Sequence, residues 1–236
     1  EFYRRMAASD KLPQTSQPPA GDFRRLFEHV LAYQPGAVYV GLSRPLSGTL
    51  QAGETAARGF SKPARVFDSG HACAGQGLLA WRAGELADAG ADVAAIEAEL
   101  ARLKPLTRTW AMARDISHAV RGGRIPRWAE PAVRYSGLLP IAAIKPDGRL
   151  SIAGGLFARR RAPEAFARYI GKRTPPAPGW RLIVGHSDAP ADGERLLAAL
   201  RERLPVVEAH LVEVGPAVGA HAGPGTLVVG LEPAPL

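Results

Sequence analysis

The chain has 236 residues, of which 46% are hydrophobic, enough to bury the core of one large domain or two ordinary ones, which excludes a disordered chain. Its apolar runs fall short of the ~18 residues that cross a bilayer, and Glu1–Arg5 lack the apolar segment of a secretory signal. The single cysteine, Cys73, excludes an internal disulfide and a cysteine-based zinc site. We therefore expect a globular, cytoplasmic protein.

Thirty lysines and arginines against 22 acidic residues give a net charge of +8. Basic surfaces bind nucleic acid by releasing counterions, so a basic nucleic-acid-binding protein is one candidate function. The arginines are scattered, however, and their densest cluster is Arg159–Arg161. Aromatic residues do not alternate with them as stacking platforms. We therefore expect no nucleic-acid partner and keep that function as an alternative.

The first hundred residues predict helices alternating with short strands. The expected helices cover about residues 1–9, 21–33, 49–58, 72–83 and 91–103, and the expected strands cover 37–42 and 65–68. Residues 12–19 contain three prolines and predict an extended loop. This alternation predicts a parallel sheet flanked by helices. Because few strands are present, we also expect further strands of this sheet upstream of Glu1.

From residue 106 the pattern changes to strands joined by hairpins and helices. The expected strands are 107–112, 138–144, 149–158, 181–186, 206–214 and 226–231, and the expected helices are 115–121, 163–170 and 191–204. The turn between the second and third strands is Pro146-Asp147-Gly148. These six strands predict a mixed sheet. We place a domain boundary near residue 104, giving domains 1–104 and 105–236.

Two loops rich in hydroxyl groups precede helices of the first domain. They are Thr15-Ser16-Gln17 and Ser47-Gly48-Thr49. Their side chains can cap the orphan N–H groups at a helix start. Alternatively, hydroxyls and helix N-termini together form a small anion site. The sequence leaves both interpretations open.

Glycines also mark two other candidate elements. Between Gly215 and Thr226, four glycines and two prolines surround His221, which indicates either an ordinary turn or a loop that closes on a ligand. Gly122-Gly123-Arg124 either ends a helix or fixes an arginine as an anchor for an anion or a partner protein.

Other chemistry is not indicated. The chain has no phosphate-binding loop, dinucleotide fingerprint or nucleophile elbow. The pairs Asp68/His71 and His186/Asp188 each lack a clustered third ligand for zinc. We therefore expect no metal site and no catalytic residue.

The glycine and hydroxyl motifs, taken together, resemble the DegV family over essentially the whole chain. The motifs that carry the resemblance, in their order and spacing, are Thr15-Ser16-Gln17-Pro18, Leu46-Ser47-Gly48-Thr49, Gly122-Gly123-Arg124-Ile125 and Gly219-Ala220-His221-Ala222-Gly223-Pro224-Gly225. Each tetrapeptide alone is a weak signal, whereas their combination is specific.

The resemblance implies a bacterial fatty-acid-binding protein with two α/β domains. One would be a three-layer α/β/α domain with a parallel sheet, the other a two-layer domain with the mixed six-stranded sheet, and the acyl chain would lie between them. Members act as carriers for a fatty acid kinase, in which a separate subunit resembling dihydroxyacetone kinases converts the fatty acid to an acyl phosphate. The resemblance therefore implies a non-catalytic subunit, a palmitate-like long-chain fatty acid as ligand, no cofactor and at most transient membrane contact.

The resemblance also implies roles for individual residues. The residues expected to hold the fatty-acid carboxylate are Thr15, Ser47 and His221. Those expected to support the pocket are Ser16, Gly48, Thr49 and Gly223. Arg124 is expected to contact the kinase subunit.

An enzymatic alternative uses the same residues. In an acyl hydrolase, Ser47 would be the nucleophile and His221 its base. Such a pair needs a third, orienting acid, and Glu213 is the carboxylate near His221 in sequence.

Overall fold

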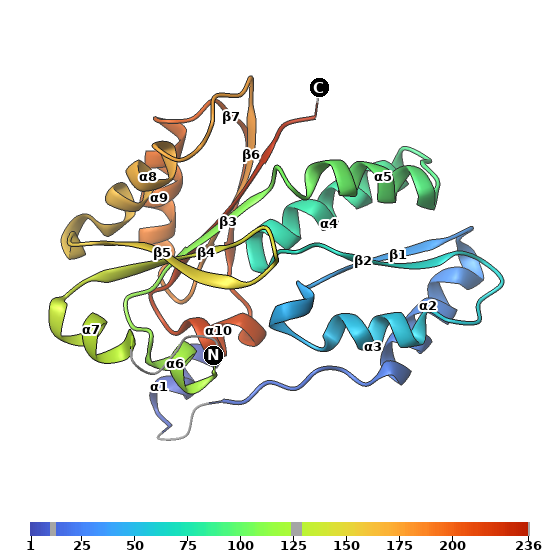
Figure 1. Cartoon of the computed structure of the whole chain (residues 1–236), viewed down its shortest axis with the longest axis horizontal. Coiled ribbons are helices and arrows are strands. Elements are labelled where there is room, and N and C mark those ends of the chain that lie inside the picture. Colours follow the sequence, from blue (N-terminus) through green and yellow to red (C-terminus); the bar gives the residue numbers. More distant parts are fainter. Residues whose placement is uncertain (10–12, 124–128, 236) are drawn as a thin grey trace.

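The computed structural model of the chain describes residues 1–9, 13–123 and 129–235 (Figure 1). The helices are α1 (Phe2–Ala7), α2 (Ala20–Tyr33), α3 (Thr49–Ala56), α4 (Cys73–Asp88), α5 (Val93–Leu103), α6 (Ser117–Arg121), α7 (Ala129–Ser136), α8 (Ala162–Gly171), α9 (Pro190–Arg201) and α10 (Pro216–Ala222). The strands are β1 (Ala37–Gly41), β2 (Ala64–Asp68), β3 (Arg108–Met112), β4 (Leu139–Ile144), β5 (Leu150–Leu156), β6 (Trp180–His186), β7 (Val206–Glu213) and β8 (Leu227–Pro233).

Strands β1 and β2 form a two-stranded parallel sheet between two layers of helices (Figure 1). On one side, Phe27 and Leu31 of α2 pack with Ala56 of α3. On the other side, Leu79 of α4 packs with Leu100 of α5. Both faces of the sheet are covered because its strands are apolar on both faces. The expected three-layer arrangement is confirmed.

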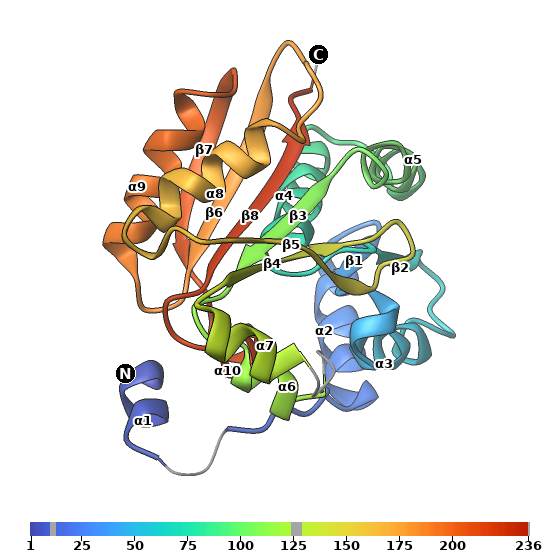
Figure 2. The ribbon, with the colours of Figure 1, turned by 60° about the vertical axis from the view of Figure 1, so that its left-hand side comes forward.

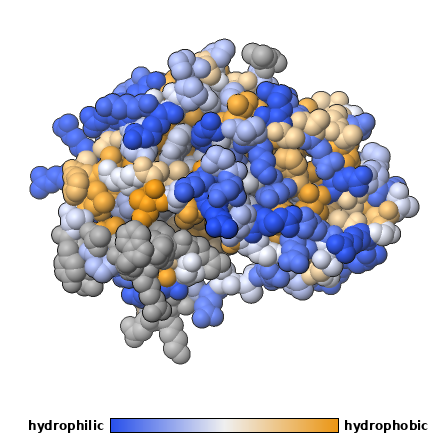
Figure 3. Space-filling model, viewed as in Figure 1, coloured by the Kyte–Doolittle hydropathy of each residue, from blue (hydrophilic) through white to orange (hydrophobic). Residues whose placement is uncertain are grey.

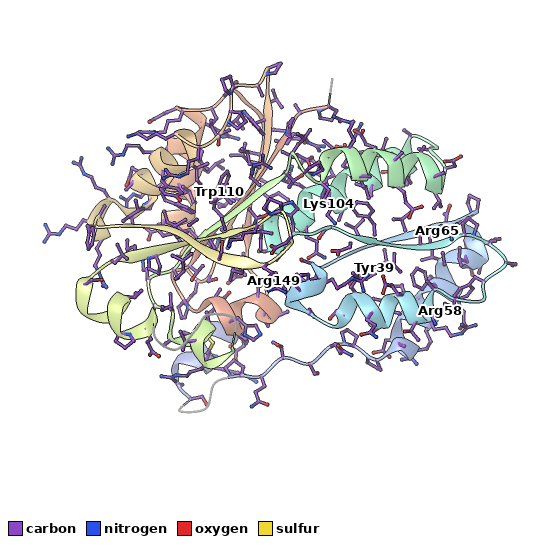
Figure 4. All side chains as sticks on the ribbon, viewed as in Figure 1. Tyr39, Arg58, Arg65, Lys104, Trp110 and Arg149 are labelled. Carbon is purple, nitrogen blue, oxygen red and sulfur yellow. The ribbon has the colours of Figure 1, made fainter. Side chains whose placement is uncertain are left out.

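The larger sheet has six strands in the order β5-β4-β3-β8-β6-β7. Only β6 and β7 pair in parallel, so the sheet is mixed, as expected. Alternate residues of each strand face α8 and α9, and these side chains are large: Trp110, Met112, Ile141, Leu182, Val229 and Leu231, for example, are buried there. This face is the main hydrophobic core, and Figure 4 shows Trp110 within it.

The opposite face of the larger sheet carries small residues. Helix α4 packs on it so closely that a Cβ at Gly230 of β8 would lie 2.5 Å from the backbone carbon of Ala74. Helix α4 thus contacts both sheets, although it precedes the boundary expected near residue 104. That boundary stays a prediction. The rest of this face is left uncovered by α4.

Two helices, α7 and α10, were not expected from the sequence. Helix α10 begins with Pro216 at its first position, where a proline needs no N–H donor, and ends at Gly223 with φ +75°. Because Gly219 lies within it and glycines stand at both of its ends, its sequence shows no helical pattern of apolar residues. Gly219 is required because a Cβ there would lie 2.5 Å from the hydroxyl of Tyr3, which donates a hydrogen bond to Val214 O at 2.6 Å. Helix α1 therefore packs against the larger sheet's side of the molecule (Figure 2).

A buried charge cluster joins α4 to the larger sheet. Arg181 of β6 is 2% exposed and stacks on Trp81 of α4, with the guanidinium 3.9 Å from the ring centre. It pairs with Glu85 of α4 and with its cross-strand neighbours Glu208 (3.0 Å) and Glu232 (3.6 Å). Glu232 is fully buried, and neither of its carboxylate oxygens has a hydrogen-bond partner among the described residues. Burial raises the pKa of Glu232 to about 7.

Glu232→Gln is expected to stabilise the protein at alkaline pH. Below pH ~4.5 the Glu232 carboxyl is protonated in both states, whereas as the pH rises through 7 the folded state must accept a buried charge and stability is lost. Glutamine avoids that loss. Urea unfolding should therefore show the variant more stable than the wild type by roughly 1–3 kcal/mol at pH ~8.5, with the difference shrinking as the pH falls from 7 and vanishing only below pH ~4.5.

The exposed Glu202→Gln variant, which removes a carboxylate at the surface, is the matched control. Burial lowers the pKa of His71, which changes stability with the opposite sign, but it does so equally in all three proteins. A constant difference between Glu232→Gln and wild type across this pH range would contradict the prediction.

Candidate ligand-binding site

A cavity of about 470 Å³ lies between the loops of the smaller sheet and the uncovered face of the larger one. Its size is in the ordinary range for small-molecule sites. The walls come from segments far apart in sequence: residues 15–17, the β1–α3 loop, the start of α4, strands β3, β4, β5 and β8, and helices α6 and α10. Most of the lining is apolar. Its polar residues are those of 15–17, Ser47 and Thr49 of the β1–α3 segment, and His221, with Thr109, Asp115 and Thr226 elsewhere in the wall.

The floor of the cavity is a row of small side chains on neighbouring strands. Ala111 of β3 lies opposite Ala142 of β4 on one side and opposite Val228 of β8 on the other. All three line the cavity. Their neighbours in sequence face the core, since side chains alternate between the two faces of a sheet. The side chains on this face are too small to fill the volume above the sheet, whereas the large side chains fill the core on the opposite face.

The β4–β5 hairpin closes one end of the cavity. Ile144, Leu150 and Ile152 line it, and the hairpin tip reaches the smaller sheet, where Ser43 donates a hydrogen bond to Gly148 O at 2.8 Å. Gly148 has φ +79°, and a Cβ there would lie 2.3 Å from Ser43 Oγ. The expected Pro-Asp-Gly turn therefore also joins the two sheets. Figure 4 shows Arg149 at this tip.

Two of the predicted site residues, Thr15 and His221, contact each other at the cavity, and Ser47 and Thr49 form a second contact there. Thr15 Oγ1 lies 2.8 Å from His221 Nε2, although 206 residues separate them. Ser47 Oγ lies 2.8 Å from Thr49 Oγ1 and accepts a hydrogen bond from Thr49 N at 3.2 Å. Thr15 is exposed, whereas Ser47, Thr49 and His221 are half-buried. These groups, with exposed Ser16, line the same cavity.

The loop of residues 15–17 does not cap the helix that follows. Helix α2 begins after Pro19 with no side-chain cap. The hydroxyls of Thr15 and Ser16 are therefore placed at the cavity and not at a helix start. For this loop the structure excludes capping of α2, whereas Ser47 accepts a hydrogen bond from the first residue of α3.

Two glycines at the mouth permit close contacts. A Cβ at Gly48 would lie 2.1 Å from Gln17 Oε1, so this glycine lets the two hydroxyl loops touch. A Cβ at Gly122 would lie 2.5 Å from His221 Nδ1. Gly122 thus allows the backbone to approach the imidazole closely. Arg124 itself, the predicted kinase contact, lies outside the described residues.

Two expectations about the histidine loop need correction. His221 lies in helix α10, near its C-terminus, and not in a turn, because Pro216 starts a short helix there. Gly223 is not among the described residues that line the cavity. With φ +75° it turns the chain after α10, where a Cβ would lie 2.6 Å from the ring of His118.

Sequence reasoning missed the floor residues and Asp115, which also lines the cavity. Asp115 is engaged locally, since its carboxylate accepts hydrogen bonds from Ser117 N and Ser117 Oγ, both at 2.8 Å. The sequence signal for the floor is the alternation of large and small residues in β3 and β8. Across residues 1–9, 13–123 and 129–235 there is no cluster of three metal-ligating side chains.

The geometry differs from that of a hydrolase. The hydroxyl that lies 2.8 Å from His221 Nε2 belongs to Thr15, and Ser47 bonds Thr49. In a hydrolase, the nucleophilic hydroxyl lies within hydrogen-bond distance of its base. Ser47, the nucleophile of the hydrolase alternative, is thus engaged with Thr49.

In Figure 3, hydrophilic side chains cover much of the visible face, with hydrophobic ones in smaller patches between them. No helix in the described parts of the chain has the length and apolar character needed to cross a membrane.

The fold and the cavity define a class: an α/β protein of two sheets with an internal apolar cavity and a mouth of hydroxyl and imidazole groups. The model of the DegV family, described as "Uncharacterised protein, DegV family", matches residues 1–234. The chain belongs to the DegV family, as its motifs indicated.

Relatives and solved structures agree with this assignment. A DegV domain-containing protein of Listeria monocytogenes is 29% identical over 231 residues, which are 96% of this chain and 81% of the relative. A Thermus thermophilus structure, described as fatty acid binding of a DegV family protein, is 28% identical with a TM-score of 0.86 over 99% of this chain and 83% of that one. A Thermotoga maritima structure, described as revealing fatty acid binding function, is 25% identical with a TM-score of 0.86, covering 99% and 82%.

Proposed function

We propose that the protein binds a long-chain fatty acid, with the acyl chain in the 470 Å³ cavity and the carboxylate at Thr15, Ser47 and His221. The observation that carries the proposal is that one cavity has an apolar part and a polar part. Apolar side chains form its floor and hairpin end, and hydrogen-bonding groups gather at its mouth. A fatty acid has the same division. The related structures described as fatty-acid-binding support this ligand.

The energetics favour slow release of such a ligand. Burying about fifteen methylenes at ~0.8 kcal/mol each gives a gross ~12 kcal/mol, before the cost of ordering the chain. Hydrogen bonds to a charged carboxylate add about 1.5–3 kcal/mol each. No metal or other cofactor is needed for this binding, and no covalent bond forms.

This geometry allows the protein to hold the acyl chain while a partner protein acts on the carboxylate. The acyl chain is enclosed, while Thr15 at the mouth is exposed. We infer that a separate, dihydroxyacetone-kinase-like subunit acts on the carboxylate there. A carboxylate oxygen would attack the γ-phosphorus of ATP, giving an acyl phosphate and ADP, and this chain would supply no catalytic residue.

The protein purified from a bacterial host is expected to contain fatty acid. Organic extraction followed by mass spectrometry should recover long-chain acids at close to one per chain. Protein stripped of lipid should then rebind the acids and be stabilised against heat by them. Extracts without fatty acid, together with no thermal stabilisation by any added acid, would overturn the proposal. Acyl phosphate formation with ATP and a kinase subunit would test the carrier role separately.

A further inference from the structure

The N-terminal part of the chain contacts helix α10 at two points. Tyr3 of α1 is buried, and its hydroxyl donates a hydrogen bond to Val214 O, just before α10, at 2.6 Å. The same hydroxyl occupies the space beside Gly219 in the middle of α10, where a Cβ would lie 2.5 Å from it. Further along the chain, Thr15 lies against His221 near the end of α10. One short helix therefore receives both contacts.

Residues 13–19 form an extended segment, which we call the strap. Figure 1 shows it running along the edge of the molecule to the start of α2. Three prolines keep its backbone extended. Within the described chain, its one backbone–backbone hydrogen bond is at its last residue, with α2. Its side-chain contacts at the cavity are those of Thr15 with His221 and of Gln17 with the loop at Gly48.

The strap separates the main cavity from solvent. Thr15, Ser16 and Gln17 line the cavity and are also exposed, so they stand between the acyl-binding space and the solution. Segments with an exposed backbone and few buried contacts open at a low free energy. Helix α1 is held more firmly, because Tyr3 and Met6, on one of its faces, are only 5% and 6% exposed.

We propose that the strap gates the cavity: a fatty acid enters and leaves when the Thr15–His221 contact opens and the strap lifts, and Tyr3 limits this movement by anchoring α1 on α10. This inference rests on the proposed function. The strap is attached at both ends, through α1 and through α2, so loosening the α1 attachment increases the fraction of open molecules. A gate that opens in free and loaded protein alike changes the rates of entry and exit together and leaves the affinity unchanged.

Tyr3→Phe tests the anchor. Phenylalanine keeps the buried ring but removes the hydroxyl that donates to Val214 O. Tyr169→Phe is the matched control, since the Tyr169 hydroxyl also donates to a backbone carbonyl, Ala153 O, at 2.6 Å, but in the core on the opposite face of the larger sheet. Met6→Ala loosens α1 without leaving a carbonyl unpaired. Mixing protein loaded with palmitic acid with excess serum albumin measures release, and calorimetric titration of stripped protein measures affinity.

Tyr3→Phe is expected to release palmitic acid roughly two- to tenfold faster than the wild type, with the affinity unchanged within about twofold. Release of hexadecanol should accelerate by the same factor, because the strap blocks the path of the whole ligand. Met6→Ala should change the rates in the same direction, and Tyr169→Phe should match the wild type.

Three results would overturn the gate: unchanged release in both α1 variants, faster release with an equal loss of affinity, or equal acceleration by Tyr169→Phe. The first would mean that α1 does not control the strap, the second that it only stabilises the bound state, and the third that any loss of stability speeds release. If the wild type binds no acid, the proposed function itself fails.

Discussion

Ala142→Phe is expected to reduce fatty-acid affinity by at least a few hundredfold while the protein stays folded. Ala142 lies in the middle of the cavity floor, opposite Ala111 on one strand and Ile152 on the other, and its side chain lines the cavity. A phenyl ring there would occupy space for about four methylenes. Because each buried methylene is worth about fourfold in affinity, their exclusion accounts for the loss. Titration of protein stripped of lipid measures it.

The fold should tolerate this change because the ring enters empty space. Filling a cavity removes none of the contacts made by Trp110 or Met112 on the opposite face of the sheet. Thermal unfolding of the free variant should therefore resemble that of the wild type. Ala153→Phe places the same ring on the adjacent strand β5 at an exposed position and should bind normally. Near-normal affinity of Ala142→Phe would place the acyl chain elsewhere.

His221→Ala is expected to remove the preference for an acid over the corresponding primary alcohol. His221 Nε2 meets Thr15 at the mouth, so both groups face the position proposed for the carboxylate. Losing one hydrogen bond to a charged group costs about 1.5–3 kcal/mol, or roughly ten- to a hundredfold in affinity. The alcohol has no charge and should lose little. Calorimetric titration with palmitic acid and hexadecanol compares the two.

Two further variants separate a head-group effect from a change in the fold. Thr15→Val keeps the shape of the side chain but removes its hydroxyl, and it should weaken the acid more than the alcohol. His29→Ala removes an exposed histidine of α2 and should change neither ligand. If His221→Ala weakened acid and alcohol equally, the imidazole would act by supporting the helix and not by binding the carboxylate.

The sequence predicted the elements of regular structure because their signals are local. The period of two in β3 and β8 and the period of 3.6 in α2 and α5 reflect which side chains each element buries against its neighbours. The six strands of the larger sheet and the layers around the smaller one follow from such patterns. Helices α7 and α10 were missed, since α10 is short and carries Pro216 and Gly219, which lack helical propensity.

The sequence by itself determined the family and the candidate head-group residues, because Thr15, Ser47 and His221 each stand in a short motif whose order along the chain is specific. Tertiary structure decided where those residues lie. Capping and ligand binding predict the same hydroxyls before a helix, and only the start of α2 after Pro19 separates them for Thr15. The cavity also depends on the tertiary structure. Ala111, Ala142 and Val228 become one floor through strand pairing between distant segments, and no local period shows which strands will be neighbours.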